Sequence, residues 1–140
     1  MALNILLVED NEGDVEMTRR AFKESKPACT ISVANDGVEA LDFLSRRENF
    51  TAAPAVQLIL LDLNMPRMGG KEFLEKVKTD TVLKAIPVVM LTSSQSPDDI
   101  RACYERHASA YVVKPFDGKA FAEAVREVAK FWNSLGRLPN

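Results

Sequence analysis

The stretch that decides the fold is Leu58-Ile59-Leu60-Leu61-Asp62-Leu63-Asn64-Met65-Pro66, and Gly69 and Gly70 follow it. Its four consecutive apolar residues indicate a strand that is covered on both faces, and such strands usually belong to parallel sheets flanked by helices. The strand ends at Asp62, so this carboxylate is expected at the carboxyl edge of the sheet. Ligands bind at that edge in open α/β sheets. Asp62 is therefore the first candidate functional residue.

Other short apolar segments alternate with segments of helical period along the chain. Strands are expected at residues 5–8, 30–33, 88–91 and 111–113, and helices at about 11–25, 38–44, 71–80, 97–107 and 118–135. Either Asn11 or Asp14 can cap the first helix. Residues 46–56 have no clear period and are expected to form a surface loop. The alternation predicts a five-stranded, doubly wound parallel α/β sheet of the flavodoxin-like kind, with strand order 2-1-3-4-5.

The size and composition of the chain restrict its class. Its 140 residues, 46% of them hydrophobic, fit a single domain with a core at about 3–135 and a short C-terminal tail. The net charge is -2, and Lys and Arg are spread along the chain, so neither nucleic acid nor a membrane surface is an expected partner. Without a basic leader or a long apolar run, we expect a cytoplasmic protein. Cys29 and Cys103 form no CxxC pair and are expected to be reduced core residues.

Polar residues follow four of the five expected strands, namely Glu9 and Asp10, Asp62, Thr92 and Lys114. If the first and third strands are neighbours, Asp10 and Asp62 face each other across the ligand crevice. Two such charges 4 Å apart repel by about 4 kcal/mol at an effective dielectric of 20. A hard cation such as Mg²⁺ would offset this repulsion, and Lys114 adds a fixed positive charge. Together with the Thr92 hydroxyl, these groups suit formation of an aspartyl phosphate.

The same residues carry a resemblance to a known family. The segments concerned are Val8-Glu9-Asp10-Asn11, Leu61-Asp62-Leu63-Asn64-Met65-Pro66, Leu91-Thr92-Ser93 and Val113-Lys114-Pro115. They resemble the signature of the response-regulator receiver domain of two-component signalling, and the resemblance covers essentially the whole chain. It implies that Asp62 accepts a phosphoryl group from a phosphohistidine on a sensor histidine kinase.

The resemblance also implies a role for each site residue. Asp10, Asp62 and the backbone carbonyl of Asn64 would bind Mg²⁺, with Glu9 acting through the water shell of the metal. Thr92 and Lys114 would hold the phosphoryl oxygens, and Tyr111 would be the aromatic switch. Asn64 and Ser94 occupy positions that tune phosphoryl lifetime in the family.

Further segments narrow the resemblance to one group of receivers. They are Asp10-Asn11-Glu12-Gly13-Asp14-Val15, the loop before the central strand, and Phe131-Trp132 followed by Leu138-Pro139. These segments resemble the stand-alone receivers that are paired with bacterial phytochromes. The resemblance implies a bacteriophytochrome as the partner kinase. Because the chain ends soon after the last expected helix, we expect its output to pass through a downstream protein.

Two other functions use a similar sheet. An aspartyl-phosphate phosphatase of the haloacid dehalogenase kind needs a second Asp two residues after the first, where this chain has Asn64. A flavodoxin-like flavin carrier would bring its cofactor phosphate against Glu9 and Asp10, which would repel it. We therefore expect a phosphorylated switch rather than a turnover enzyme or a flavin protein.

The final helix has more apolar surface than packing on a sheet requires. Phe121, Val125 and Val128 form one stripe, and Phe131 and Trp132 are adjacent, so their side chains point about 100° apart. We expect a homodimer whose interface includes these five residues. The alternative is a monomer in which Trp132 folds over the end of the helix.

Overall fold

A computed structural model describes residues 3–24, 29–45, 55–136 and 138 of the chain. Within them, five parallel strands form a sheet of order β2-β1-β3-β4-β5, which confirms the predicted fold class. The strands are β1 (Asn4–Val8), β2 (Thr30–Ala34), β3 (Leu58–Leu61), β4 (Val88–Thr92) and β5 (Ala110–Val113). The main helices are α1 (Glu12–Lys23), α2 (Gly37–Ser45), α3 (Gly70–Thr79), α4 (Pro97–Glu105) and α5 (Gly118–Lys130).

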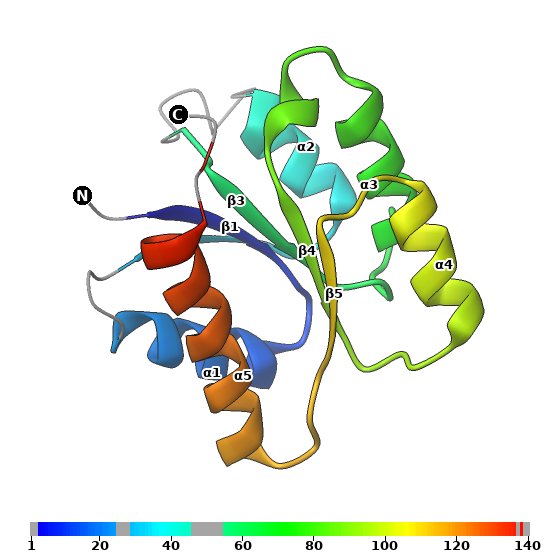
Figure 1. Ribbon diagram of the computed structural model, residues 1–140. Coiled ribbons are helices and arrows are strands. Elements are labelled where there is room, and N and C mark those ends of the chain that lie inside the picture. The colour runs from blue at the N-terminus through cyan, green and yellow to red at the C-terminus, as the bar shows by residue number, and fades with distance from the viewer. Residues whose placement is uncertain (1–2, 25–28, 46–54, 137, 139–140) are drawn as a thin grey trace.

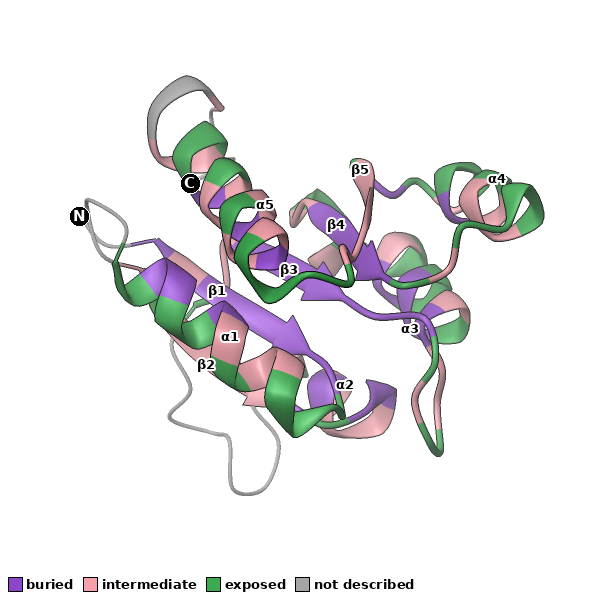
Figure 2. Ribbon diagram, turned by 90° about the horizontal axis from the view of Figure 1, so that it is seen from below, coloured by how far each residue is buried: buried purple, intermediate pink, exposed green. Residues whose placement is uncertain are grey.

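The helices cover both faces of the sheet. Figure 1 shows α1 and α5 together on one side, and α2, α3 and α4 on the other. The central strands β1, β3 and β4 are buried between these layers (Figure 2). Because strand side chains alternate between faces, Leu6 and Val8 join the core under α2 and α3, while Ile5 and Leu7 join the core under α1 and α5.

Local hydrogen bonds explain where the helices begin. Asn11, rather than Asp14, caps α1, because its Oδ1 accepts the Asp14 backbone N–H at 2.9 Å. Ser96 caps α4 and Asp117 caps α5 in the same way. Helix α4 ends at Glu105, before the predicted residue 107, and exposed His107 follows it with φ 70. These caps fix the residue at which each of these helices begins, a few residues after the preceding strand ends.

The last helix departs from the prediction of a regular helix to residue 135. Helix α5 ends at Lys130, and the π-helical turn η3 (Phe131–Leu135) follows, closed by a Gly136 N–H to Phe131 O bond of 2.7 Å. The rings of Phe131 and Trp132 meet edge to face with centroids 5.0 Å apart. Adjacent side chains are splayed in an ordinary helix, so the sequence period alone does not indicate this contact.

Other departures are smaller. A short 3-10 turn, η2 (Leu83–Ala85), precedes β4 and was not predicted. Cys103 is buried as expected, whereas Cys29 is only half-buried and its sulfur accepts the Asn133 amide at 3.5 Å. Residues 46–54 of the expected surface loop lie outside the described residues. No described helix is long and apolar enough to cross a membrane.

Candidate phosphoacceptor and metal site

The acidic residues converge where β1 and β3 end side by side. Val8 pairs with Leu61 in the sheet, and the Asp62 N–H donates to the Val8 carbonyl at 3.0 Å. The residues that follow the two strands are therefore neighbours. Glu9, Asp10 and Asp62 each bring a carboxylate oxygen to within 4.8 Å of the others. This is the edge of the sheet at which the sequence places a ligand.

The three carboxylates differ in burial. Glu9 and Asp62 are buried, with Asp62 8% exposed, whereas Asp10 is exposed. The cluster therefore opens to solvent on the side of Asp10. Hard divalent cations such as Mg²⁺ and Mn²⁺ prefer oxygen ligands, so this donor set fits such an ion.

Lys114 reaches the cluster from the end of β5. Its backbone N–H donates to the Thr92 carbonyl at 2.7 Å, which holds it beside the end of β4. Its ammonium group donates hydrogen bonds to Glu9 and, at 2.8 Å, to Asp14 Oδ2, and lies 3.8 Å from Asp62 Oδ2. The structure thus places Lys114 among the acids, with Glu9 and Asp14 as its hydrogen-bond acceptors.

Sequence reasoning missed the role of Asp14, which it considered only as a helix cap. Asp14 lies four residues after Asp10, in the first turn of α1, and its carboxylate points back to Lys114. A helix that starts directly after a strand places its first turn over that strand's end. The position of Asp14, four residues after Asp10, was therefore the sequence feature that could have indicated its place in the cluster.

Burial and charge shift the pKa values of two groups in the cluster. Burial is the main cause that raises the pKa of Glu9 to about 7, and the nearby Asp62 charge adds to it, against the Lys114 hydrogen bond. Burial alone would lower the pKa of Lys114, but hydrogen bonds to Asp14 and Glu9 outweigh it and raise that pKa. Lys114 is thus a permanent cation among several acids, which leaves negative charge for a second cation to balance.

Thr92 and Tyr111 are connected through Ser94 in the β4–α4 loop. Thr92 is buried at the end of β4, and its hydroxyl oxygen accepts the Ser94 N–H at 3.4 Å. The half-buried Tyr111 donates its hydroxyl to the Ser94 carbonyl at 2.9 Å. A displacement of this loop would therefore change the hydrogen bonds of both Thr92 and Tyr111.

The Ser94 side chain is bonded to the first turn of α4, which the sequence did not indicate. Its hydroxyl donates to Asp99 Oδ2 at 2.5 Å, and Asp99 pairs with Lys71 at 2.7 Å. Asn64, in the loop after β3, has an exposed side chain. The sequence analysis singled out Asn64 and Ser94 as functional candidates, but it did not single out Lys71 or Asp99.

Comparison with known proteins agrees with this geometry. The profile described as the response regulator receiver domain matches residues 5–126. The chain belongs to this receiver family. Response regulator Rcp1 of Synechocystis is 37% identical over 135 residues, which cover 96% of this receiver and 92% of that protein. The predicted family is therefore confirmed.

Solved structures extend the comparison. The phosphorylated cyanobacterial phytochrome response regulator RcpA superposes with a TM-score of 0.96 at 35% identity over 100% of both chains. The Mn²⁺-bound form of Rcp1 gives a TM-score of 0.94 at 36% identity over 99% of both chains. The bacteriophytochrome response regulator RtBRR is 43% identical, with a TM-score of 0.77 over 99% of this chain and 85% of that one. This receiver is thus similar to response regulators of phytochromes.

The structure corrects part of the predicted dimer interface. Phe121 and Val125 are buried in the receiver's own core, because their stripe is the one that packs α5 on the sheet, so neither can contact a partner. Val128 and Trp132 are half-buried, and Phe131 is 47% exposed.

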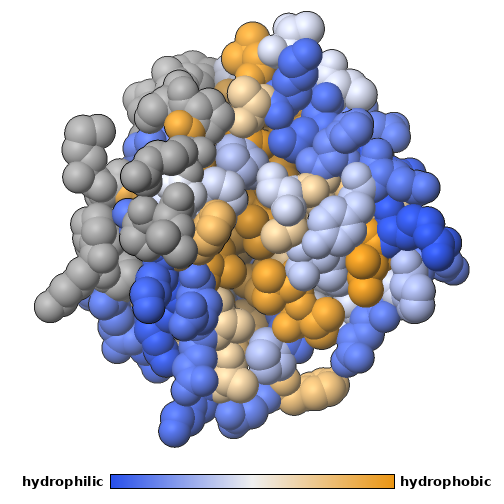
Figure 3. Space-filling model, viewed as in Figure 1, coloured by the Kyte–Doolittle hydropathy of each residue, from blue (hydrophilic) through white to orange (hydrophobic). Residues whose placement is uncertain are grey.

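These three residues line an apolar groove of about 590 Å³ between α5 and the β4–β5 edge of the sheet. Hydrophobic residues gather in the middle of this face of the molecule (Figure 3). Trp132 also packs against the core under α5.

Proposed function

We propose that Asp62 accepts a phosphoryl group from a phosphohistidine of a sensor histidine kinase. The observation that carries the proposal is the cluster of acids at the ends of β1 and β3, with the Lys114 ammonium group 3.8 Å from Asp62. An Asp62 oxygen attacks the phosphorus, and the bond between phosphorus and the donor nitrogen breaks, leaving its electron pair on the imidazole. Asp62 is 8% exposed, so its carboxylate is shielded yet reachable.

The other residues of the site prepare Asp62 for this step. Glu9, Asp10, Asp62 and the Asn64 carbonyl would hold Mg²⁺. When bound, the ion supplies positive charge next to the acids and to the phosphoryl oxygens. Lys114 stabilises a phosphoryl oxygen by charge, and the Thr92 hydroxyl donates to another. The Lys114 ammonium group has three N–H donors, and Glu9 and Asp14 accept from two of them, so the third can donate to that oxygen.

The phosphorylated state is read out by a change in the β4–α4 loop. When the Thr92 hydroxyl turns to the phosphoryl group, it leaves the Ser94 N–H that it now accepts. Tyr111 is bound to the Ser94 carbonyl and responds to the same movement. Thr92 and Tyr111 are therefore the switch residues of this proposal.

The partner kinase is a phytochrome-linked histidine kinase, and the reaction takes place in the cytoplasm, where the kinase has access to ATP. The similarity to Rcp1, RcpA and RtBRR supports this choice of partner. The receiver acts as a switch on a downstream protein, and the only reactions that it catalyses are its own phosphorylation and dephosphorylation. Asn64 supports this, because it stands where a phosphatase of the haloacid dehalogenase kind needs its acid.

A second copy of the receiver is also part of the proposal. The apolar groove beside α5 and the exposed ring of Phe131 suit an interface between two copies. Val128, Phe131 and Trp132 would contribute to it.

Phosphorylation by a small donor tests the function directly. The wild type, incubated with acetyl phosphate and Mg²⁺, should gain one phosphoryl group, and the modified peptide should contain Asp62. Asp62→Asn should remain unmodified, because an amide is a poor nucleophile. Labelling of Asp62→Asn at the wild-type level would place the acceptor elsewhere.

A further inference from the structure

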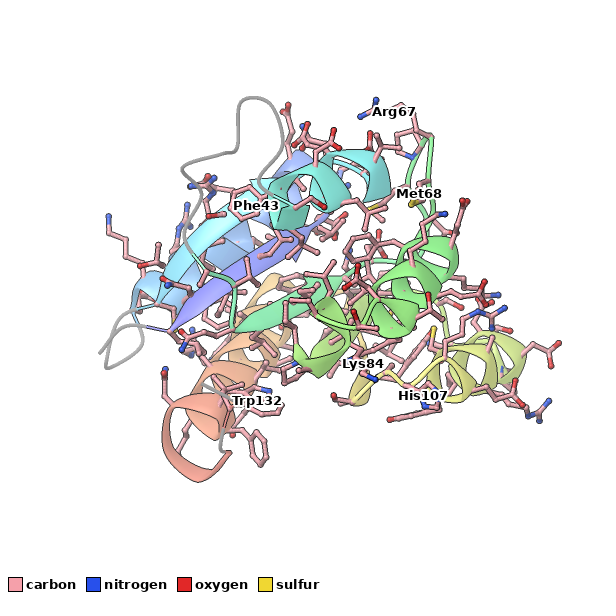
Figure 4. All side chains as sticks on the ribbon, turned by 90° about the horizontal axis from the view of Figure 1, so that it is seen from above. Phe43, Arg67, Met68, Lys84, His107 and Trp132 are labelled. Atoms are coloured by element: carbon pink, nitrogen blue, oxygen red, sulfur yellow. The ribbon has the colours of Figure 1, made fainter. Side chains whose placement is uncertain are left out.

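The loop between β3 and α3, residues 62–69, is fastened to the corner between β2 and α2. The Gly37 N–H donates to the Met68 carbonyl at 3.1 Å, and Arg67 Nε donates to Asp36 Oδ2 at 2.7 Å. Arg67 and Met68 lie beside the N-terminal end of α2 (Figure 4). The contact is close, since a Cβ atom added to Gly37 would lie 2.7 Å from the Met68 side chain.

The two partners of the ion pair differ in burial. Asp36 is held in place, because its side chain is 7% exposed and its Oδ1 also accepts the Glu39 N–H at 2.9 Å. The Arg67 side chain is 58% exposed. A pair with one exposed partner adds little to global stability. The free energy of unfolding therefore does not explain why an arginine occupies this position.

The backbone conformation of Arg67 is one that arginine rarely adopts. Its φ is 61, in the left-handed region, which is strained for a residue with a Cβ atom and where Gly or Asn is usual. A strained residue that persists indicates a local constraint or a function. Here the Arg67 side chain supplies what glycine cannot, a bond from the tip of the loop to Asp36.

This loop carries the backbone of Asn64. At its other end the Gly70 N–H donates to the Leu63 carbonyl at 2.8 Å. Asn64 therefore lies between two anchors, the Gly70 bond and the Arg67–Asp36 pair. Removing the second anchor leaves the tip of the loop held by backbone bonds and by the packing of Met65 and Met68, without a polar side-chain bond to the β2–α2 corner.

We infer that Asp36 and Arg67 are positioning residues, which hold the β3–α3 loop so that the Asn64 carbonyl is ready to bind a divalent cation. The inference rests on the proposed function, in which that carbonyl is a metal ligand. Residues that orient metal ligands typically change affinity by about 10-fold or more when they are mutated.

Arg67→Gly separates positioning from stability. Glycine removes the ion pair and relieves the left-handed strain, so the melting temperature should be unchanged or raised. The dissociation constant for Mg²⁺ or Mn²⁺, measured by calorimetry without any phosphoryl donor, should increase by about tenfold. Phosphorylation by acetyl phosphate should need more Mg²⁺ and reach the wild-type rate at saturation.

Two further variants and one control complete the test. Asp36→Asn keeps the helix cap but removes the charge, and should weaken metal binding as much as Arg67→Gly, with no added loss in the double variant. Arg67→Lys should restore part of the affinity. Arg101→Gln, at an exposed arginine that pairs with Asp98 at 3.6 Å, should leave metal binding unchanged.

The possible outcomes are distinct. Equal metal affinity of the wild type and Arg67→Gly would overturn the inference and leave the proposed function intact. Additive losses in the double variant would also overturn it, because the two residues would then act separately. A wild type that binds neither Mg²⁺ nor Mn²⁺ would overturn the proposed function together with the inference.

Discussion

At the scale of single residues, the site is an arrangement of like charges. Glu9, Asp10 and Asp62 lie within 4.8 Å of one another by their carboxylate oxygens, and one ammonium group, that of Lys114, is shared with Asp14. Such a cluster favours binding of a cation over stability of the metal-free protein. Substitutions that remove charge should therefore have opposite effects with and without metal.

Asp10→Asn tests whether the acidic cluster favours cation binding at the expense of stability without metal. Asp10 is exposed and Asn11 is the cap of α1, so the change removes repulsion and leaves the helix start intact. We expect a higher melting temperature than wild type in chelator, and a smaller increase on adding Mg²⁺. Thermal unfolding followed by circular dichroism measures both. A variant that is less stable than wild type in chelator would contradict a functional acidic cluster.

Asp36 gives a pH dependence. Burial alone would raise its pKa, but Arg67 and the backbone amide of Glu39 outweigh burial and hold the pKa below its usual value of 3.8. A carboxyl whose pKa is lowered in the folded state stabilises the protein at pH values above the usual pKa of that group. This contribution is lost as the pH falls through the folded-state pKa.

Asp36→Asn should therefore lower the free energy of unfolding near neutral pH, by at most about 1 kcal/mol because Arg67 is largely exposed. The difference from wild type should shrink as the pH falls below 3.8. Urea unfolding across this range measures it. A difference that stays constant with pH would show that the charge of Asp36 is not involved.

At the scale of elements, α3 packs directly against the end of the strand that carries Asp62. Gly70 makes this possible: a Cβ atom there would lie 2.3 Å from the Asp62 carbonyl oxygen and 2.8 Å from Leu63 Cα. Both neighbours are backbone atoms, so neither can move unless the strand end moves. The position of Asp62 thus depends on the absence of a side chain at the first residue of the next helix.

Gly70→Ala should destabilise the fold by about 1–3 kcal/mol, as overpacking of a core does, and slow phosphorylation of Asp62. Gly118→Ala is the matched control, because glycine there also begins a helix and its added Cβ would meet only Met17 Sδ at 3.7 Å. We expect a change of about 0.5 kcal/mol or less for the control. Equal stability of the two variants in urea would contradict the close packing of α3.

At the scale of the whole molecule, the apolar groove beside α5 sets the expected assembly. Phe131→Ala should convert a homodimer into a folded monomer that is still phosphorylated on Asp62. Tyr104→Ala is the control, because Tyr104 is 48% exposed, similar to Phe131 at 47%, but does not line the groove. Light scattering measures the mass of each variant.

The interface should bury more than about 1,000 Å². A wild type that stays monomeric at high concentration, with and without a phosphoryl analogue, would rule out the dimer. Loss of the dimer in Tyr104→Ala but not in Phe131→Ala would assign the interface to the α4 side instead.

The sequence alone was sufficient for the sheet and for the acids at its edge. The unbroken apolar run that ends at Asp62 and the shorter run before Glu9 and Asp10 are local patterns, and parallel strands bring their carboxyl ends to one edge whatever the helices do. The strand order, the family and the convergence of these acids could therefore be anticipated without a structure.

Only the tertiary structure decided which side chains meet across long separations. Lys114 bonds to Glu9 and Asp14, which are 105 and 100 residues away, and Arg67 reaches Asp36 across 31 residues. Likewise, the period of α5 does not indicate that Phe121 faces the core while Phe131 stays exposed at the start of a π-helical turn. Such contacts depend on how far each helix is rotated and shifted on the sheet, and packing of the whole core sets those positions.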